Sequence, residues 1–247
     1  MISTNKSLSI IIPLHNKATT IVQTLEKIKT DLVNIDYEVL IIENSSNDNS
    51  YEIADSWCKK NLNINCKILQ STKGVGTAIK KGIEVASCEF ISIMPGDMQF
   101  GTSDIESFIK FYDSEIKIYI GSRMHPESIV YREKNRKLFS KVFSFLKKIL
   151  INSEINDTMG SFVAEATTLK QLYLYPRTKK FFYVTELVAY YELFNYKILE
   201  IPVKTFREIN EESGNKSSVN FFVTPIEIII NLISLKIRII IFRLKNQ

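Results

Sequence analysis

Cysteine, proline, glycine and long apolar runs are all scarce in this 247-residue chain. It has three cysteines, six prolines and eight glycines. Cys58, Cys66 and Cys88 have spacings that match no metal-binding or disulfide framework, so we expect reduced thiols, as in a cytosolic protein. The low proline and glycine content argues against linkers and low-complexity tracts. The apolar run at residues 10–12 is too short for the core of a signal peptide.

The composition is that of an ordinary globular protein, but the positive charge is concentrated in one stretch. Hydrophobic residues make up 45% of the chain and charged residues 24%, which predicts a well-buried core in one large domain or two small ones. The net charge is +5. Between positions 123 and 148 the basic residues are Arg123, Arg132, Lys134, Arg136, Lys137, Lys141, Lys147 and Lys148. This stretch suits the phosphates of nucleic acid, anionic lipid or a phosphorylated acceptor, although a solvated helix face has the same pattern.

Short apolar runs alternate with segments of helical spacing over the first 120 residues. The predicted strands are residues 9–12, 38–42, 66–69, 90–94 and 116–120. The predicted helices lie between them, at residues 21–32, near 53–57, at 75–86 and from 103 onward. Strands that alternate with helices indicate an α/β fold, in which a parallel sheet has helices on both faces.

Polar clusters follow four of these strands. They are His15 with Asn16, residues 43–48, residues 95–97, and Arg123. Because ligands of such sheets bind beyond the carboxyl ends of the strands, we expect these clusters to converge on one edge and form the functional site.

The chain changes character after residue 125. Residues 131–150 predict a helix, followed by a helix at 185–194, a strand at 197–201 and a polar loop at 208–218. The apolar stripe of the first helix consists of Leu138, Val142, Phe145 and Ile149. Arg132, Arg136 and Ser140 step by four and therefore share one face of that helix.

The C-terminal segment, residues 225–247, is very apolar but is interrupted by polar residues. Glu227, Asn231, Ser234 and Arg238 fall on one face of a helix. A spanning helix needs about 20 mostly apolar residues without charges, so we expect an amphipathic helix at a membrane interface instead. A helix packed on the domain or on a dimer partner is the alternative.

Residues 8–16, with the sequence LSIIIPLHN, resemble the opening strand of inverting family-two glycosyltransferases. The closest branch is that of the dolichyl-phosphate mannosyltransferases and related polyprenyl-phosphate glycosyltransferases. The resemblance runs over residues 8–218. It implies a GT-A fold, which is Rossmann-like and mostly parallel, over residues 1–218, with a nucleotide-binding half at 1–123 and an acceptor half at 124–218. An amphipathic helix, for a membrane interface or a dimer, would occupy 219–247.

The resemblance also implies a donor site at the first two strand ends. Pro13, His15 and Asn16 match the loop that holds the nucleoside, with His15 where tyrosine is usual and Lys17 where glutamate is usual. Glu43 matches the acid that accepts a hydrogen bond from the base or ribose, a role that suits an acceptor-only carboxylate.

A glycine-rich turn would complete the phosphate-binding side of the donor site. Lys73 and Gly74 match the family's turn into a helix, where glycine permits close approach and the helix N-terminus favours phosphate. The dinucleotide-binding fingerprint would need a third glycine at position 79, which is Ile79.

Residues 94–99, with the sequence MPGDMQ, lie where the family has its metal-binding Asp-x-Asp motif. Asp97 and Gln99 are retained, Pro95 replaces the first aspartate, and Gly96 would lie against the donor. Mg²⁺ or Mn²⁺ bound here would neutralise the charge that develops on the departing nucleoside diphosphate. A plain turn containing proline and glycine is the alternative.

Residues matching the acceptor site follow the fifth strand. In the lipid-phosphate branch the matching residues bind the acceptor phosphate, which assigns this role to Arg123, Arg136, Ser140 and, in the flexible loop, Arg207. A phosphate oxygen is already anionic and needs no general base. If the acceptor is instead a hydroxyl, Asp157 is the candidate base.

Three functions are therefore open. The first is metal-assisted, inverting transfer of a sugar from a UDP- or GDP-linked donor to a polyprenyl-phosphate-type lipid. The second is the same donor chemistry with a sugar hydroxyl as acceptor, in surface polysaccharide or glycolipid synthesis. The third is a binding module without turnover, for which the missing first aspartate is the only argument. We expect a cytoplasmic, peripheral protein at the inner face of the cell membrane, with no nucleic-acid partner and with homodimerisation open.

Overall fold

The computed structural model describes residues 6–96, 101–131, 134–158, 160–205 and 223–245. Within these ranges, side chains are not described at positions 134–137 and 223–225. The strands are β1 (Leu8–Leu14), β2 (Tyr37–Glu43), β3 (Asn65–Gln70), β4 (Phe90–Ile93), β5 (Ile116–Ser122), β6 (Phe162–Glu165) and β7 (Lys197–Pro202). The helices are α1 (Ile21–Asp31), α2 (Ser50–Lys60), α3 (Val75–Val85), α4 (Ser103–Lys110), α5 (Lys134–Ile151), α6 (Ala166–Leu172), α7 (Phe182–Leu193) and α8 (Val223–Lys245).

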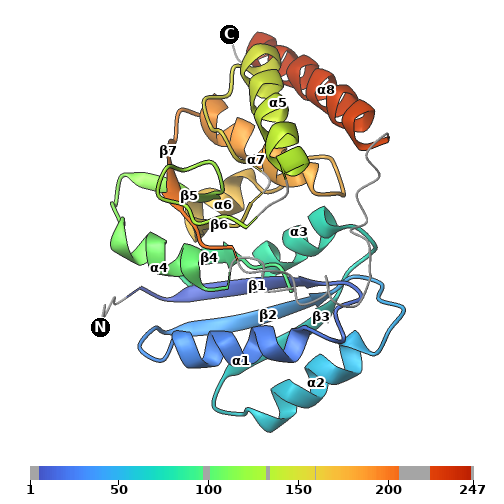
Figure 1. The fold of residues 1–247 in the computed structure, drawn as a ribbon, viewed down its shortest axis with the longest axis vertical. Helices are drawn as coiled ribbons and strands as arrows, with labels where there is room; N and C mark the ends of the chain where they lie inside the picture. Colours follow the sequence, from blue (N-terminus) through green and yellow to red (C-terminus); the bar gives the residue numbers. More distant parts are fainter. Residues whose placement is uncertain (1–5, 97–100, 132–133, 159, 206–222, 246–247) are drawn as a thin grey trace.

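The described strands form one seven-stranded sheet in the order β3-β2-β1-β4-β6-β5-β7 (Figure 1). All neighbours are parallel except β6, which runs antiparallel to both β4 and β5. The predicted α/β fold with a mostly parallel sheet is therefore confirmed. β1 is almost wholly buried on both sides, as expected for an isoleucine-rich strand at the centre of such a sheet.

Helices cover both faces of the sheet and pack two separate cores. Helices α1, α2 and α4 share one core with residues such as Ile10 and Ile12 of β1. Helices α3, α6 and α7 share the other, to which β1 contributes Ile11. The alternation along β1 thus follows the period of two that a strand imposes. A third cluster joins α5, α7 and α8, and places α5 and α8 outside α7, away from the sheet (Figure 1).

The prediction of three reduced cysteines is wrong for two of them. Cys58 near the end of α2 and Cys66 on β3 form a disulfide, with their Cα atoms 5.7 Å apart. Cys88 is free. The seven residues between Cys58 and Cys66 turn the chain from α2 directly into the adjacent edge strand, a proximity that spacing alone did not reveal.

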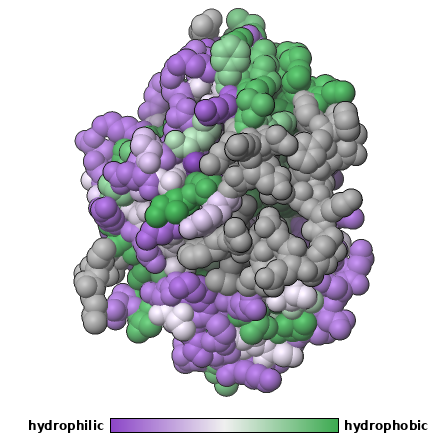
Figure 2. Space-filling model, viewed as in Figure 1, coloured by the Kyte–Doolittle hydropathy of each residue, from purple (hydrophilic) through white to green (hydrophobic). Residues whose placement is uncertain are grey.

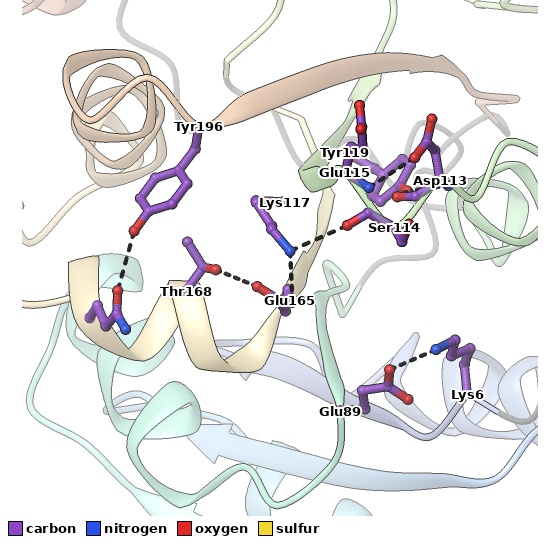
Figure 3. A network of polar contacts seen from close by, with 11 residues as sticks. Lys6, Glu89, Asp113, Ser114, Glu115, Lys117, Tyr119, Glu165, Thr168 and Tyr196 are labelled. Carbon is purple, nitrogen blue, oxygen red and sulfur yellow. Dashed lines mark hydrogen bonds and ion pairs between the residues drawn. The ribbon is translucent and has the colours of Figure 1, made fainter.

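The amino edge of the strands carries a network of mostly exposed polar contacts (Figure 3). Lys117 on β5 pairs with Glu165 at the end of β6, at 3.0 Å. Lys6 pairs with Glu89 just before β4, at 2.7 Å. Because β6 is antiparallel, Glu165 reaches the edge where the parallel strands begin. These pairs fasten strand ends together at the edge opposite the predicted site.

Candidate functional site

The loops that follow β1 and β2 are joined by hydrogen bonds at the carboxyl edge. The Nδ1 of His15 donates to the carbonyl oxygen of Asn44 at 2.8 Å. Asn16 has a left-handed backbone, with φ of 51°, and its Oδ1 accepts from the backbone N–H of Asn47 at 2.8 Å. Pro13 forms part of β1, one residue before the strand ends. The structure thus brings the predicted nucleoside loop against the loop that follows Glu43.

Glu43 is the last residue of β2 and is half-buried. Its Oε1 accepts the backbone N–H of Ser46 at 2.5 Å. This contact orients the carboxylate along its own loop, because one of its two oxygens is committed to the backbone. The predicted contact of Glu43 with a base or ribose would therefore use the lone pairs of the carboxylate that Ser46 does not occupy.

Asn44 ties the glycine turn to β2, and sequence reasoning missed it. Its Oδ1 accepts the N–H of Gly74 at 2.7 Å, and its Nδ2 donates to the carbonyl of Gly74 at 2.8 Å. Asn44 is only 4% exposed. Gly74 has φ of 129°, which L side chains rarely adopt, and it precedes α3. Its neighbour Lys73 is exposed. The only signal for Asn44 was its place directly after Glu43.

The segment that follows β4 is anchored to α1. The carbonyl oxygen of Gly96 accepts from the hydroxyls of Thr20 and Thr24, at 2.9 and 3.2 Å. Asp97 and Gln99, the predicted metal ligands, lie outside the described residues. Within the residues that are described, no group of three or more histidines, cysteines and acids could hold a metal ion.

Arg123 and Asp157 form a buried two-pronged ion pair beyond β5. The Nε and Nη2 of Arg123 donate to the two carboxylate oxygens of Asp157, at 2.6 and 2.7 Å. The backbone N–H of Arg123 donates to the same carboxylate at 3.0 Å. The two side chains are 9% and 6% exposed. The antiparallel β6 explains the encounter, because its first residue, Phe162, pairs with Ile120 near the end of β5, and Asp157 lies shortly before it in the chain.

Lys147 holds the loop that carries Asp157. It is completely buried, and its Nζ donates to the carbonyls of Ile155 and Asn156 at 2.8 and 3.2 Å, and to Thr158 Oγ1 at 3.2 Å. Burial lowers the pKa of this amine to about 8, against the attraction of nearby carboxylates, Asp157 first among them. Lys147 therefore does not contribute to the basic surface predicted from the sequence, because its side chain faces inward from α5.

The remaining acceptor residues are only partly described. Ser140 lies on α5 and is half-buried. Arg136 lies one turn earlier on the same helix, but its side chain is outside the description. Arg207 lies outside the described residues altogether. The structure therefore brings together Arg123 and Asp157, while the predicted meeting of Arg123 with Arg136 and Ser140 remains a prediction.

Helices α5 and α8 present a broad apolar surface away from the sheet (Figure 2). The exposed large apolar residues of α5 are Leu138, Val142, Phe145 and Ile149. Those of α8 are Ile226, Ile229, Ile230, Ile233, Ile237, Ile240, Ile241 and Leu244. The stripe predicted for α5 thus lies on the exposed side, while Phe143 is buried on the packed side. Such contiguous patches mark interaction sites in soluble proteins.

Among the described residues, no helix combines the length and apolar character needed to cross a membrane. The alternative predicted for the C-terminal helix, packing on the domain, is borne out for one side of it. Ile228, Leu232 and Leu235 of α8 are buried in the third core. What covers the opposite side stays a prediction.

The fold belongs to the class seen in glycosyltransferases that bind nucleotide sugars. A glucosyl-3-phosphoglycerate synthase from Mycobacterium tuberculosis, solved with Mn²⁺, UDP-glucose and phosphoglyceric acid, matches with a TM-score of 0.64 at 13% identity. The match covers 94% of this chain and 80% of that one. The same enzyme with Mg²⁺ and UDP matches with a TM-score of 0.59, also at 13% identity, over 85% and 75% of the two chains. At this identity the likeness establishes the GT-A-like fold.

The family is established by the sequence itself. The family model described as glycosyl transferase family 2 matches residues 9–167. The chain therefore belongs to glycosyltransferase family 2, and the predicted enzyme class is confirmed.

Three curated relatives agree with the predicted branch. Glycosyltransferase AglD of Haloferax volcanii is 23% identical over 79% of this chain and 32% of its own length. The dolichyl-phosphate beta-glucosyltransferase of Homo sapiens is 26% identical over 81% and 68%. The dolichol-phosphate mannosyltransferase of Pyrococcus furiosus is 27% identical over 63% and 45%. The aligned part of this chain spans between about a third and about two thirds of the length of these relatives.

Proposed function

We propose that this chain transfers a sugar from a nucleoside-diphosphate sugar to a polyprenyl-phosphate-type lipid, with inversion at the anomeric carbon and with Mg²⁺ or Mn²⁺. The donor is UDP- or GDP-linked. The single observation that carries the acceptor assignment is the buried pair of Arg123 with Asp157 at the carboxyl end of β5. Two of the three named relatives are called dolichyl- or dolichol-phosphate sugar transferases, which supports the same class of acceptor.

The donor site would be the hydrogen-bonded group around Asn44. His15 and Asn16 border the nucleoside, Glu43 accepts from the base or ribose, and the N-terminus of α3 faces the diphosphate. The N–H groups of Gly76, Thr77 and Ala78 are already paired within the protein, so the attraction for an anion comes from the dipole of α3. Lys73 adds a positive charge beside the turn.

The metal would be held by Asp97 with the amide oxygen of Gln99. One carboxylate, one amide oxygen, the diphosphate and water form an acceptable ligand set for Mg²⁺ or Mn²⁺. When bound, the ion supplies charge neutralisation for the departing nucleoside diphosphate. The neighbouring Gly96 would be kept in place by its hydrogen bonds from α1.

The acceptor assignment depends on the ion pair between Asp157 and Arg123. Both of its oxygens accept from Arg123, so the carboxylate orients the guanidinium. An oriented guanidinium is well suited to hold a phosphate in line with the anomeric carbon, with Arg136, Ser140 and Arg207 as its partners. A phosphate oxygen attacks without a general base. The geometry therefore supports a phosphate acceptor over a hydroxyl acceptor, for which Asp157 would have to accept a proton.

A titration with nucleotides tests the donor site. Thermal unfolding would be followed with UDP, GDP, CDP and dTDP, each with and without Mn²⁺. A ligand at about 100 times its dissociation constant adds about 2.7 kcal/mol to the free energy of unfolding. We expect a metal-dependent shift with UDP or GDP. No shift with any nucleotide would leave only a binding module without turnover.

A transfer assay separates the two acceptors. With the identified donor, we expect sugar transfer to a short polyprenyl phosphate and none to the matching polyprenol or to free sugars. Transfer to a hydroxyl compound, with none to the phosphate, would replace this function with the polysaccharide or glycolipid alternative.

The apolar surface of α5 and α8 would seat the enzyme on an anionic membrane surface. Exposed basic residues lie on the same helices, among them Lys141 and Lys148 on α5 and Lys236 and Arg243 on α8. Glu227 is the only acid in either helix, and it pairs with Lys180. Apolar side chains flanked by basic ones match the acyl chains and head groups of anionic lipid.

Vesicle sedimentation tests this surface. The double variant Phe145→Asp/Ile237→Asp should no longer sediment with phosphatidylglycerol vesicles, whereas Leu62→Asp, at an exposed apolar residue after α2, should sediment like the unaltered protein. Equal sedimentation of all three proteins would contradict the assignment, and a protein that self-associates without vesicles would indicate a dimer face.

A further inference from the structure

Part of the polar side of α8 lines a groove of about 430 Å³ between this helix and the rest of the protein. Asn231, Ser234 and Arg238 lie on the α8 side of the groove, and its opposite wall contains Arg177, Thr178 and Glu186. Two ion pairs cross from α8 to this wall. Glu227 pairs with Lys180 at 2.7 Å where both side chains are largely exposed, 40% and 72%. Arg238 pairs with Glu186 in the interior, where the side chains are 13% and 0% exposed.

Glu186 connects Arg238 to the backbone at Arg177 and Thr178, because it accepts hydrogen bonds from both sides. One carboxylate oxygen takes the ion pair with Arg238. The other accepts from the N–H of Arg177 at 2.7 Å, and from the N–H and hydroxyl of Thr178 at 2.9 and 3.1 Å. A buried carboxylate with four partners has one well-defined position, since any loss of a partner leaves charge unsatisfied.

The segment at 177–179 in turn abuts the glycine turn. The N–H of Gly76 donates to the carbonyl of Lys179 at 2.8 Å. A Cβ on Gly74 would lie 2.5 Å from that oxygen, and a Cβ on Gly76 would lie 2.7 Å from the carbonyl of Thr178. Both glycines are therefore in close backbone contact with the segment. A shift of Lys179 must move the turn, because no space separates them.

We propose that Arg238 and Glu186 are positioning residues of the donor site, through which the placement of α8 sets the geometry of the turn at Gly74 and Gly76. This inference rests on the proposed role of that turn in holding the donor diphosphate. The contacts form one continuous path from α8 through Glu186 and Lys179 to Gly74 and Asn44. Donor affinity therefore depends on a helix that contributes no residue to the donor site itself.

The test measures the dissociation constant of UDP or GDP with Mn²⁺, by calorimetry, for the nucleotide that shifts the unaltered protein. Arg238→Met removes the buried link, and Glu227→Gln removes the exposed link between the same two elements. We expect affinity to fall about tenfold in Arg238→Met and to stay within twofold in Glu227→Gln. In the transfer assay, KM for the donor should rise while KM for the acceptor stays constant.

A lowered melting temperature in Arg238→Met with unchanged nucleotide affinity would make the pair merely structural and would overturn the proposal. If that variant does not fold, Arg238→Lys takes its place, since it keeps the charge but shortens the reach. Weaker donor binding by a folded Arg238→Lys supports the positioning role, and unchanged binding contradicts it. An unaltered protein that binds no nucleotide would instead remove the proposed function, and this inference with it.

Discussion

Strand β5 carries a basic residue near each end, and the two residues are paired in very different surroundings. At the amino edge, Lys117 meets Glu165 at 3.0 Å, with both side chains 29% exposed (Figure 3). At the carboxyl edge, Arg123 meets Asp157 through two hydrogen bonds, with exposures of 9% and 6%. β6, antiparallel to β5, supplies the partner at one edge and, through the loop before it, at the other.

The two ion pairs differ in the free energy that their desolvation costs. An exposed ion pair contributes little to stability and is easily replaced. A buried pair costs free energy to desolvate, and it is retained only with good geometry and further hydrogen bonds. The carboxyl edge adds such support, since the N–H of Asp157 donates to Glu200 at 3.1 Å and Lys147 holds the adjacent carbonyls. Oriented charge is therefore concentrated at the edge where we propose the site.

Asp157→Ala should have the largest effect of these variants on stability and on transfer activity. It leaves the guanidinium of Arg123 buried without its partner, which costs about 3–5 kcal/mol of unfolding free energy. Transfer activity should fall about a hundredfold or more, because the guanidinium loses its orientation. Urea unfolding and the transfer assay measure the two effects. A loss below 1 kcal/mol would place this pair in the same class as the exposed one.

Lys147→Met should remove the pH dependence of stability that this buried amine contributes. The pKa of Lys147 is about 8 in the folded protein, below its ordinary value of 10.5. The unfolded chain therefore binds an extra proton between these pH values, and the stability contributed by this group is present above pH 10.5 and lost as pH falls through 8. The unaltered protein should gain about 3 kcal/mol relative to the variant between pH 7.5 and 10.5. Parallel stability curves for the two proteins would contradict the lowered pKa.

Asp104→Asn tests a buried acid whose contribution to stability changes with pH in the opposite direction. Asp104 lies in the first turn of α4 and is fully buried, and burial raises its pKa from 3.8 to about 6. Its stabilising contribution is present below pH 3.8 and is lost as pH rises through 6. Stability of the variant relative to the unaltered protein should therefore improve by about 2 kcal/mol between pH 4 and pH 7. Urea unfolding at the two pH values measures this change, and no change would indicate an acid with an ordinary pKa.

Lys117→Met, at the amino edge, should have the smallest effect. Removing one side of a partly exposed pair costs about 0–1 kcal/mol. Transfer activity should not change, because this edge lies away from the site. A larger loss in either measurement would remove the distinction between the two edges.

Much of the fold could be predicted because its information is local. Apolar runs and helical spacing located β1 to β5 and the helices between them, and the alternation implied a sheet whose strand ends share one edge. The same rule placed His15, Glu43 and Arg123 at that edge. Family membership could also be recognised from the sequence, because short motifs occur in a specific order at the strand ends.

The tertiary structure alone decided the pairings between distant segments. Short, apolar β6 was not predicted, so nothing indicated that Asp157 would meet Arg123. Lys147 was counted in the basic stretch although it is buried, and the periodicity of the stripe containing Phe145 did not reveal that this stripe is exposed. Periodicity records which residues share a side of a helix, but not what covers that side. Burial depends on contacts between segments far apart in the chain, and these exist only once the sheet and its outer helices have assembled.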